Sequence, residues 1–177
     1  MRIEHNIPQL QKVLASISSG IEKKAAVNAL NRAADQAKTQ AKREMTKKYS
    51  FKSSEVGKTI AVYKAHSGRV EATVLSSGKR TPLLAMGARQ TKKGVTVKVS
   101  KGRKLIPSAF IATMKSGHKG VFKRLTSKNL PFKELYTIAI PEGFASKDVM
   151  DAMKDKMSEV FFKRFEHELK RLIEMQG

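Results

Sequence analysis

The chain has 177 residues, of which 40% are hydrophobic, and its 36 Lys or Arg against 15 Asp or Glu give a formal net charge of +21. This length predicts a single domain with a substantial core, and such a charge surplus predicts an anionic partner because it repels itself in the compact state. The lack of Cys excludes disulfides, thiolate metal sites and a thiol nucleophile. The first ten residues do not resemble a signal peptide, and no stretch has the roughly 18 apolar residues of a membrane span, so we expect a soluble protein.

Two helices are expected at the N-terminus. Asn6 is a suitable cap for a short first helix that ends near Ile17. Ser19 and Glu22 have the spacing of a capping box at the start of a longer helix over residues 21–48. The apolar stripe of this second helix is mostly alanine, which permits close approach by a neighbouring helix or sheet; it consists of Ala26, Leu30, Ala33, Ala34, Ala37, Ala41 and Met45.

The middle of the chain is typical of short strands. Residues 59–63 and 69–75 are rich in β-formers and flank Ser67-Gly68, which predicts a hairpin. Val95, Val97 and Val99 alternate with polar residues, as in a half-buried strand. Further candidate strands are residues 105–106, 109–114, 120–125 and 135–140, with residues 101–104 as a turn.

The last segment predicts a long amphipathic helix with Ser146 as its N-cap. Its apolar face has 3-4 spacing and comprises Met150, Met153, Met157, Val160, Phe161, Phe165, Leu169 and Leu172. The chain as a whole predicts an α+β fold: N-terminal helices, a central mostly antiparallel sheet of five or six short strands, and this helix packed on the sheet. We expect one domain over residues 1–177, divided into the helices of 1–48, a basic β-rich region at 58–140 and the helix of 147–175.

The positive charge is unevenly distributed along the sequence. Residues 147–177 hold seven basic and seven acidic residues, so the whole surplus precedes them. Between Glu71 and Glu134 there are 15 Lys or Arg and no acid. Ordinary solvated surfaces mix both signs, so this region predicts a surface for DNA or for an acidic protein partner. The candidate residues are Lys79, Arg80, Arg89, Lys92, Lys93, Lys101, Arg103, Lys104, Lys119, Lys123 and Arg124.

The sequence offers no pattern that indicates catalysis, a metal site or a cofactor. The four His are far apart, and Ser116 and His118 lie in a glycine-flanked turn without the strand-to-helix elbow of a hydrolase. There is no phosphate-binding loop and no signature of a sequence-reading nucleic-acid module. Phe110, Phe122 and Phe132 are interpreted as core residues. We therefore expect a protein that is not an enzyme, with no cofactor, whose contact with DNA, if made, goes to phosphates without sequence readout.

Five strings, in order, resemble the prophage minor tail protein Z family. They are residues 29–37 (ALNRAADQA), 88–95 (ARQTKKGV), 106–112 (IPSAFIA), 117–124 (GHKGVFKR) and 130–135 (LPFKEL). The third is similar to the family's Ile-Pro-x-Ala-Phe-Ile segment. Together the strings cover about residues 20–145, and their common order makes the resemblance fairly specific.

The resemblance implies a non-enzymatic structural protein of long-tailed phages that acts in tail completion and head–tail joining at the head-proximal end of the tail. It further implies a location in the virion, with assembly in the host cytoplasm, and contacts with tail tube, terminator or tape-measure components. A homo-oligomeric ring, a hexamer if it matches the tail's sixfold symmetry, is also implied. From charge alone, the alternative is a free protein that binds nucleic acid without regard to sequence, such as a nucleoid-associated protein.

Overall fold

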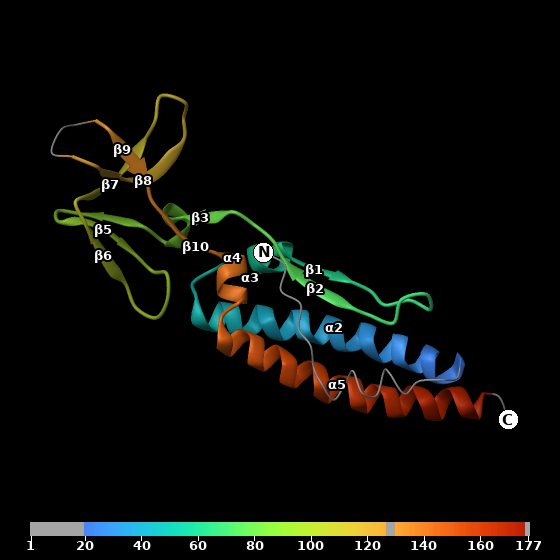
Figure 1. The fold of residues 1–177 in the computed structure, drawn as a ribbon. Coiled ribbons are helices and arrows are strands. Elements are labelled where there is room, and N and C mark those ends of the chain that lie inside the picture. Colours follow the sequence, from blue (N-terminus) through green and yellow to red (C-terminus); the bar gives the residue numbers. More distant parts are fainter. Residues whose placement is uncertain (1–19, 127–129, 176–177) are drawn as a thin grey trace.

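The computed structural model describes residues 20–126 and 130–175 as an elongated molecule with two paired helices at one end and small sheets at the other (Figure 1). In chain order the elements are α2 (Gly20–Lys48), α3 (Ser53–Thr59), β1 (Ile60–Tyr63), β2 (Thr73–Ser76), β3 (Arg80–Pro82), the 3-10 helix η1 (Leu83–Met86), β4 (Arg89–Thr91), β5 (Gly94–Val97), β6 (Lys104–Pro107), β7 (Ala109–Thr113), β8 (Lys119–Arg124), β9 (Phe132–Glu134), β10 (Tyr136–Ala139), α4 (Ile140–Phe144) and α5 (Lys147–Glu174).

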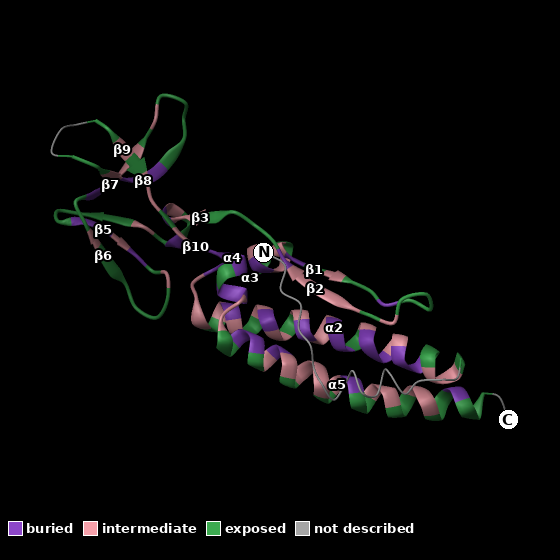
Figure 2. Cartoon of the chain, viewed as in Figure 1, coloured by how far each residue is buried: buried purple, intermediate pink, exposed green. Residues whose placement is uncertain are grey.

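The two long helices, α2 and α5, pack side by side and antiparallel; we call them the helical pair. Near the start of α2, the Asn28 amide donates a hydrogen bond of 3.0 Å to the Glu168 carboxylate near the end of α5. At the other end, the Lys48 ammonium lies 2.7 Å from the Asp148 carboxylate. The α2 face between these contacts is the alanine stripe, fully buried as expected (Figure 2). Because alanine has a short side chain, the α5 side chains can lie directly against the α2 backbone.

The predicted apolar face of α5 is confirmed. Met150, Met153, Phe161 and Leu172 are buried, and the Phe161 ring stacks on Phe165 with 5.5 Å between centroids. Ser146 occupies the N-cap position as predicted, but its hydroxyl is buried and donates or accepts no capping hydrogen bond among the described residues. Next to the helix start, the Asp148 carboxylate accepts a hydrogen bond from the Lys48 ammonium of α2.

A β-hairpin extends alongside the helical pair. Strands β1 and β2 pair antiparallel, from Ile60 opposite Ser76 to Tyr63 opposite Thr73, as the sequence predicts. Asn31 of α2 holds the far end of this hairpin: its amide oxygen accepts from the Ala65 N–H at 2.7 Å, and its amide nitrogen donates to the Ala65 carbonyl at 3.0 Å. A small core forms between the hairpin and both helices, around Phe161.

The other end of the molecule is the β lobe, defined as residues 79–139. It contains two three-stranded antiparallel sheets, β4-β5-β6 and β7-β8-β9, and the pair β3–β10, through which the chain enters and leaves (Figure 1). Val95, Val97 and Val121 are buried in it, and their cluster is continuous with Phe51, Val56 and the end of α2. The lobe and the helical pair therefore share one core.

Gly94 begins β5 at a position that only glycine fits. Its φ of 149° lies in the region that favours glycine, and a Cβ atom there would lie 2.2 Å from the Ile106 carbonyl oxygen of the paired strand. Gly94 thus allows the close approach of β5 and β6.

The α+β class, the antiparallel strands and the long C-terminal helix are confirmed. The described residues form ten short strands in four small sheets, where we expected one sheet of five or six. The long helix α5 packs mainly along α2. Together, α5 and the hairpin cover the alanine stripe of α2. The predicted first helix and its cap, Asn6, lie outside the described residues, as does Ser19.

Candidate functional site

All eleven cations predicted to form an interaction surface lie in the β lobe. Lys79 and Arg80 lead into β3, and Arg89 lies on β4. Lys92 and Lys93 form the turn between β4 and β5. Each of these five side chains is exposed, because the three-residue strands β3 and β4 have solvent on at least one face.

The other six cations lie further along the lobe. Lys101 and Arg103 are in the turn before β6, and Lys104 is the first residue of that strand. Strand β8 contributes the remaining three, Lys119, Lys123 and Arg124. All six are exposed except Lys123, which is half-buried. Adjacent residues of a strand point to opposite faces, so Lys123 and Arg124 project to different sides. The eleven candidates thus share one end of the molecule, and Lys123 and Arg124 lie on different faces of their strand.

None of the eleven cations pairs with an acid among the described residues. Two are held by other groups. Arg103 donates a hydrogen bond to the Gly87 carbonyl, and the Arg124 guanidinium lies over the Phe110 ring, 5.2 Å from its centroid. Their charges remain exposed, so the lobe presents cations that an external anion can reach.

Glu134 is the only acid in the β lobe, and it is already engaged. The Tyr136 hydroxyl donates to one carboxylate oxygen at 2.7 Å, and the His118 Nε2 lies 3.0 Å from the other. The hydrogen bond from Tyr136, followed by that from His118, lowers the pKa of Glu134 below its usual value. The carboxylate is thus held close to Gly120 of β8, with its side chain 14% exposed, and no Lys or Arg among the described residues pairs with it.

Three phenylalanines of the β7-β8-β9 sheet pack against each other. The Phe122 ring lies 6.1 Å from Phe110 and 5.4 Å from Phe132 between centroids, and Phe110 and Phe132 meet edge to face at 6.0 Å. Phe122 is buried, and the other two are half-buried. Because the rings cover each other and Arg124 covers Phe110, they leave little free ring surface on which a base could stack.

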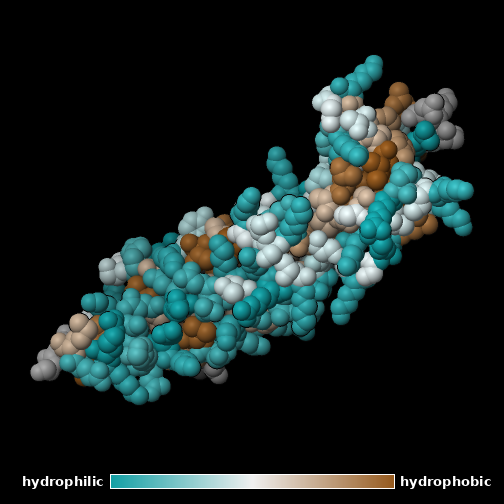
Figure 3. All heavy atoms as spheres, turned by 180° about the vertical axis from the view of Figure 1, so that it is seen from behind, coloured by the Kyte–Doolittle hydropathy of each residue, from teal (hydrophilic) through white to brown (hydrophobic). Residues whose placement is uncertain are grey.

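The surface of the lobe also exposes large apolar side chains. Leu125, Leu130 and Tyr136 are 54%, 67% and 47% exposed. Figure 3 shows hydrophobic areas on this end of the molecule with long hydrophilic side chains projecting around them. Large apolar side chains are also exposed outside the lobe, at Tyr63, Phe162 and Ile173, and only contiguous patches of such residues are typical of protein–protein interaction surfaces.

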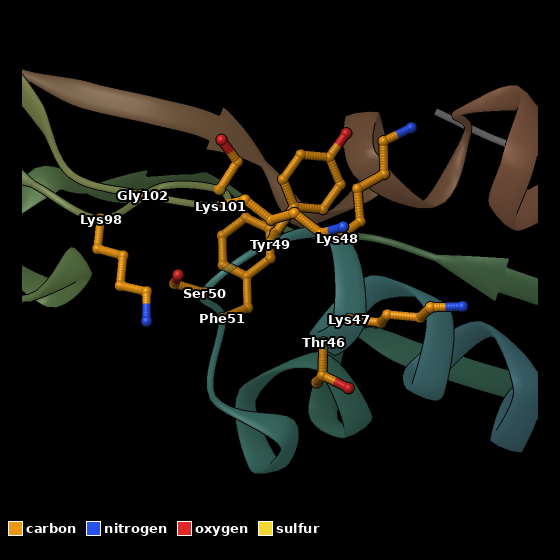
Figure 4. A pocket seen from close by; sticks show the side chains of 10 residues that line it. Thr46, Lys47, Lys48, Tyr49, Ser50, Phe51, Lys98, Lys101 and Gly102 are labelled. Carbon is orange, nitrogen blue, oxygen red and sulfur yellow. The ribbon is translucent and has the colours of Figure 1, made fainter.

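A cleft at the junction of the helical pair and the β lobe was missed by the sequence reasoning. It has a volume of about 540 Å³ and is lined by Thr46, Lys47, Lys48, Tyr49, Ser50, Phe51, Lys98, Ser100, Lys101 and Gly102 (Figure 4). Only Lys101 among these is one of the eleven candidates. The lysines come from two segments far apart in the sequence, so no local pattern indicates the cleft.

The described residues contain no group of three or more His, Cys, Asp or Glu side chains that could hold a metal ion. Within the same residues, no helix is long and apolar enough to cross a bilayer. The turn at Ser116 and His118 is observed as expected, with the Met114 N–H donating to the His118 carbonyl at 2.7 Å.

The fold and the surface define an elongated, strongly basic α+β protein whose β lobe contains 15 Lys or Arg and one acid. A family model for prophage minor tail protein Z (GPZ) matches residues 7–176, well beyond the span of the five strings. The chain belongs to the prophage minor tail protein Z family, and its role is that of a structural component of a phage tail, located in the virion. Neither the curated proteins nor the solved structures gave a significant match.

Proposed function

We propose that this tail protein acts in tail completion and head–tail joining at the head-proximal end of the tail, with the β lobe directed toward DNA or an acidic tail component. The proposal rests on one observation, the unequal distribution of basic and acidic residues between the β lobe and α5. Residues 79–139 contain 15 Lys or Arg and one acid, Glu134, whereas residues 147–177 contain seven basic and seven acidic residues. One end of the molecule thus remains free to meet a polyanion.

A tail protein that contacts passing DNA must accept DNA of any sequence. The lobe meets this requirement, because its cations lie mostly in turns and on short strands and would contact phosphates rather than base edges. Lysines that are loosely arranged and strongly hydrated also hold DNA less firmly than bidentate arginines would. The lobe therefore favours attraction of DNA over a fitted clamp.

We propose further that copies of the chain assemble into a ring, with six subunits if it follows the tail's sixfold symmetry, and that tube, terminator or tape-measure proteins contact it. The exposed Leu125, Leu130 and Tyr136 support a protein interface on the lobe. Assembly would take place in the host cytoplasm before the tail joins the head.

The first test is deletion of the gene from the prophage, followed by electron microscopy of the particles after induction. We expect heads and tails that fail to join productively, with infectivity restored by the gene supplied in trans. A labelled copy should be located at the head-proximal end of purified tails. Normal infectious particles that lack the protein would overturn the proposal.

A second test distinguishes the effect of the lobe's positive charge from the effect of the protein's total charge. Replacing Lys92, Lys93, Lys104 and Lys119 with Gln should impair joining or DNA positioning while tails still contain the protein. The matched control replaces four exposed cations of the helical pair, Lys23, Lys24, Arg43 and Lys163, and should leave infectivity near the unmodified level. Equal defects in both variants would assign the effect to net charge and count against the lobe.

The alternative is a free, sequence-independent nucleic-acid-binding protein, favoured only by the total charge of +21. It predicts tight binding of duplex DNA by the isolated protein, with the logarithm of the binding constant falling by about 0.9 per phosphate contacted for each tenfold rise in salt. Such binding, together with absence from purified tails, would favour this alternative. Association with tails and weak binding to free duplex would favour tail completion.

A further inference from the structure

The cleft at the junction has two walls that come from different parts of the chain. One wall is the end of α2 and the residues after it, with Lys47 and Lys48; the other is the connection between β5 and β6, with Lys98 and Lys101 (Figure 4). The Ser50 N–H donates to the Val99 carbonyl at 2.9 Å and joins the walls at the base. The cleft is therefore a built feature of the fold, held by backbone pairing and by the buried Phe51.

The cleft carries positive charge that acidic side chains neutralise only in part. Lys48 pairs with Asp148 at 2.7 Å, and this hydrogen bond raises the pKa of Lys48. Lys47 lies 3.8 Å from Glu44, a loose contact. Lys98 and Lys101 have no acidic partner among the described residues, and both are exposed. The wall from the lobe thus carries two ammonium groups without a counter-charge, within a few residues of each other.

The aromatic side chains of the cleft favour a peptide over a nucleic acid. Stacking of a base needs a free ring face, but Phe51 is buried and its ring lies 5.6 Å from that of Tyr49. The Lys48 ammonium lies over the Tyr49 ring, 5.8 Å from its centroid. The rings therefore supply apolar edges rather than platforms. Aliphatic stems of a peptide can contact such edges, while lysines offer three donors each to carboxylates.

The volume agrees with this chemistry. A cleft of about 540 Å³ is within the range of pockets that hold small ligands, about 300–1,000 Å³, and so accommodates a few residues of an extended chain. We propose that this cleft binds a short acidic segment of another protein, whose carboxylates contact Lys98 and Lys101 and whose apolar atoms lie against the half-buried Tyr49. The inference rests on the cleft and not on the head-proximal role proposed above.

An occupant of the cleft would touch both parts of the molecule at once. Because Lys47 belongs to α2 and Lys98 directly follows β5, a bound peptide would link the helical pair to the β lobe. Binding would then restrict movement of the lobe relative to the helices, in addition to the restriction imposed by the shared core.

The test is fluorescence anisotropy with a labelled peptide of three Glu-Leu repeats and the full-length protein. The variant K98Q/K101Q removes the two unpaired ammonium groups, and K23Q/K24Q removes the same charge from the exposed start of α2, far from the cleft. We expect peptide affinity to fall about tenfold in K98Q/K101Q, as for the loss of two partly exposed charge contacts, and to stay within about twofold in K23Q/K24Q. Both variants change exposed residues only, so both should fold.

Two further probes complete the experiment: a peptide of three Ser-Leu repeats and a single-stranded oligonucleotide of six thymidines. Weak binding of both supports the proposal. No binding of the Glu-Leu peptide, or equal losses in the two variants, overturns it. Preferred binding of the oligonucleotide with loss in K98Q/K101Q also overturns it and assigns the cleft to nucleic acid. None of these results depends on head–tail joining, which the deletion experiment tests separately.

Discussion

The helical pair and the β lobe differ in how many acidic residues accompany their basic residues. Along the helical pair, cations face acids at short range: Lys48 pairs with Asp148, Lys170 with Glu166 and Arg171 with Glu168. In the β lobe the one acid, Glu134, is held by His118 and Tyr136. No Lys or Arg of the lobe that the structure describes forms an ion pair with an acid. Exposed ion pairs add little stability, so this pairing does not explain why the helices hold together.

The difference in charge between the two regions supports the proposal that the lobe is the part that meets an anionic partner. The helical pair is held by close packing. Helix α2 has eight basic and three acidic residues, and residues 147–177 have seven of each, so the pair is less basic than the lobe. The lobe tolerates mutual repulsion, which costs stability. A cost of that kind is expected where a surface meets an opposite charge in the assembled state.

The largest effect is expected from removing a ring from the core of the helical pair. Phe161→Ala should lower the free energy of unfolding by about 3–5 kcal/mol, because Phe161 is fully buried between α2, α5 and the hairpin. Chemical denaturation followed by circular dichroism measures the change. Phe162→Ala is the control, since Phe162 is 37% exposed and should lose much less. Similar losses in both variants would contradict the assigned packing.

In the β lobe, the largest effect is expected at the start of β5. Gly94→Ala should cost about 1–3 kcal/mol from its backbone conformation, with an added cost from the contact with the Ile106 carbonyl. Gly102→Ala serves as the matched control, because Gly102 also has a positive φ, 87°, but no atom within 4 Å of the added Cβ. The difference in unfolding free energy between the variants isolates the contact. A difference near zero would show that β5 and β6 move apart easily.

Salt should affect the two regions differently. Raising sodium chloride shortens the screening length from about 10 Å at 0.1 M to about 3 Å at 1 M, which weakens repulsion among the lobe's cations. Amide hydrogen exchange at Val95 and Val121 should slow by roughly twofold to fivefold. Exchange at Ala33 in α2 should change little. Uniform slowing throughout the chain would remove the distinction between the regions.

The smallest effect concerns Glu134. Because its pKa is lowered in the folded protein, the interaction adds stability above the carboxyl's ordinary pKa, and that stability is lost as the pH falls through the lowered value. Tyr136→Phe removes the first cause of the shift and should raise the pKa of Glu134, as measured by NMR titration of its side chain. Tyr63→Phe, at an exposed residue of β1, is the control. An unchanged Glu134 pKa in Tyr136→Phe would disprove the hydrogen bond.

Sequence alone predicted the elements whose pattern is long and periodic. The alanine stripe of α2 and the face around Phe161 repeat over many turns, so the helical period is unambiguous. Strands β3, β4 and β9 were not predicted, because three residues such as Arg89–Thr91 are too short to show alternation and depend on the partner strand for their register. Helix α3 was missed at Ser53–Thr59 because its single buried residue, Val56, gives no repeat.

The candidate surface was predicted as a segment rich in basic residues. Because these residues lie close together in the sequence, the folded chain places them in one lobe. The directions in which these side chains project from the lobe could not be predicted from the sequence, because they depend on the direction of each turn. The cleft could not be predicted, because Lys47 and Lys98 are far apart in the sequence and their segments meet only in the folded chain, through the hydrogen bond between Ser50 and Val99 and the shared core. Whether these cations bind DNA or protein stays a prediction.

The chain enters the β lobe on β3 and leaves it on β10, and Arg80 lies opposite Ala139 in that pair. Entry and exit are therefore neighbours, so an insertion or deletion in a turn of the lobe shifts nothing in the register between α2 and α5. Evolution can lengthen, shorten or recharge these turns to suit a new partner while the rest of the molecule keeps its shape. Among relatives, we expect the sequences of the lobe's turns to diverge faster than the alanine stripe of α2.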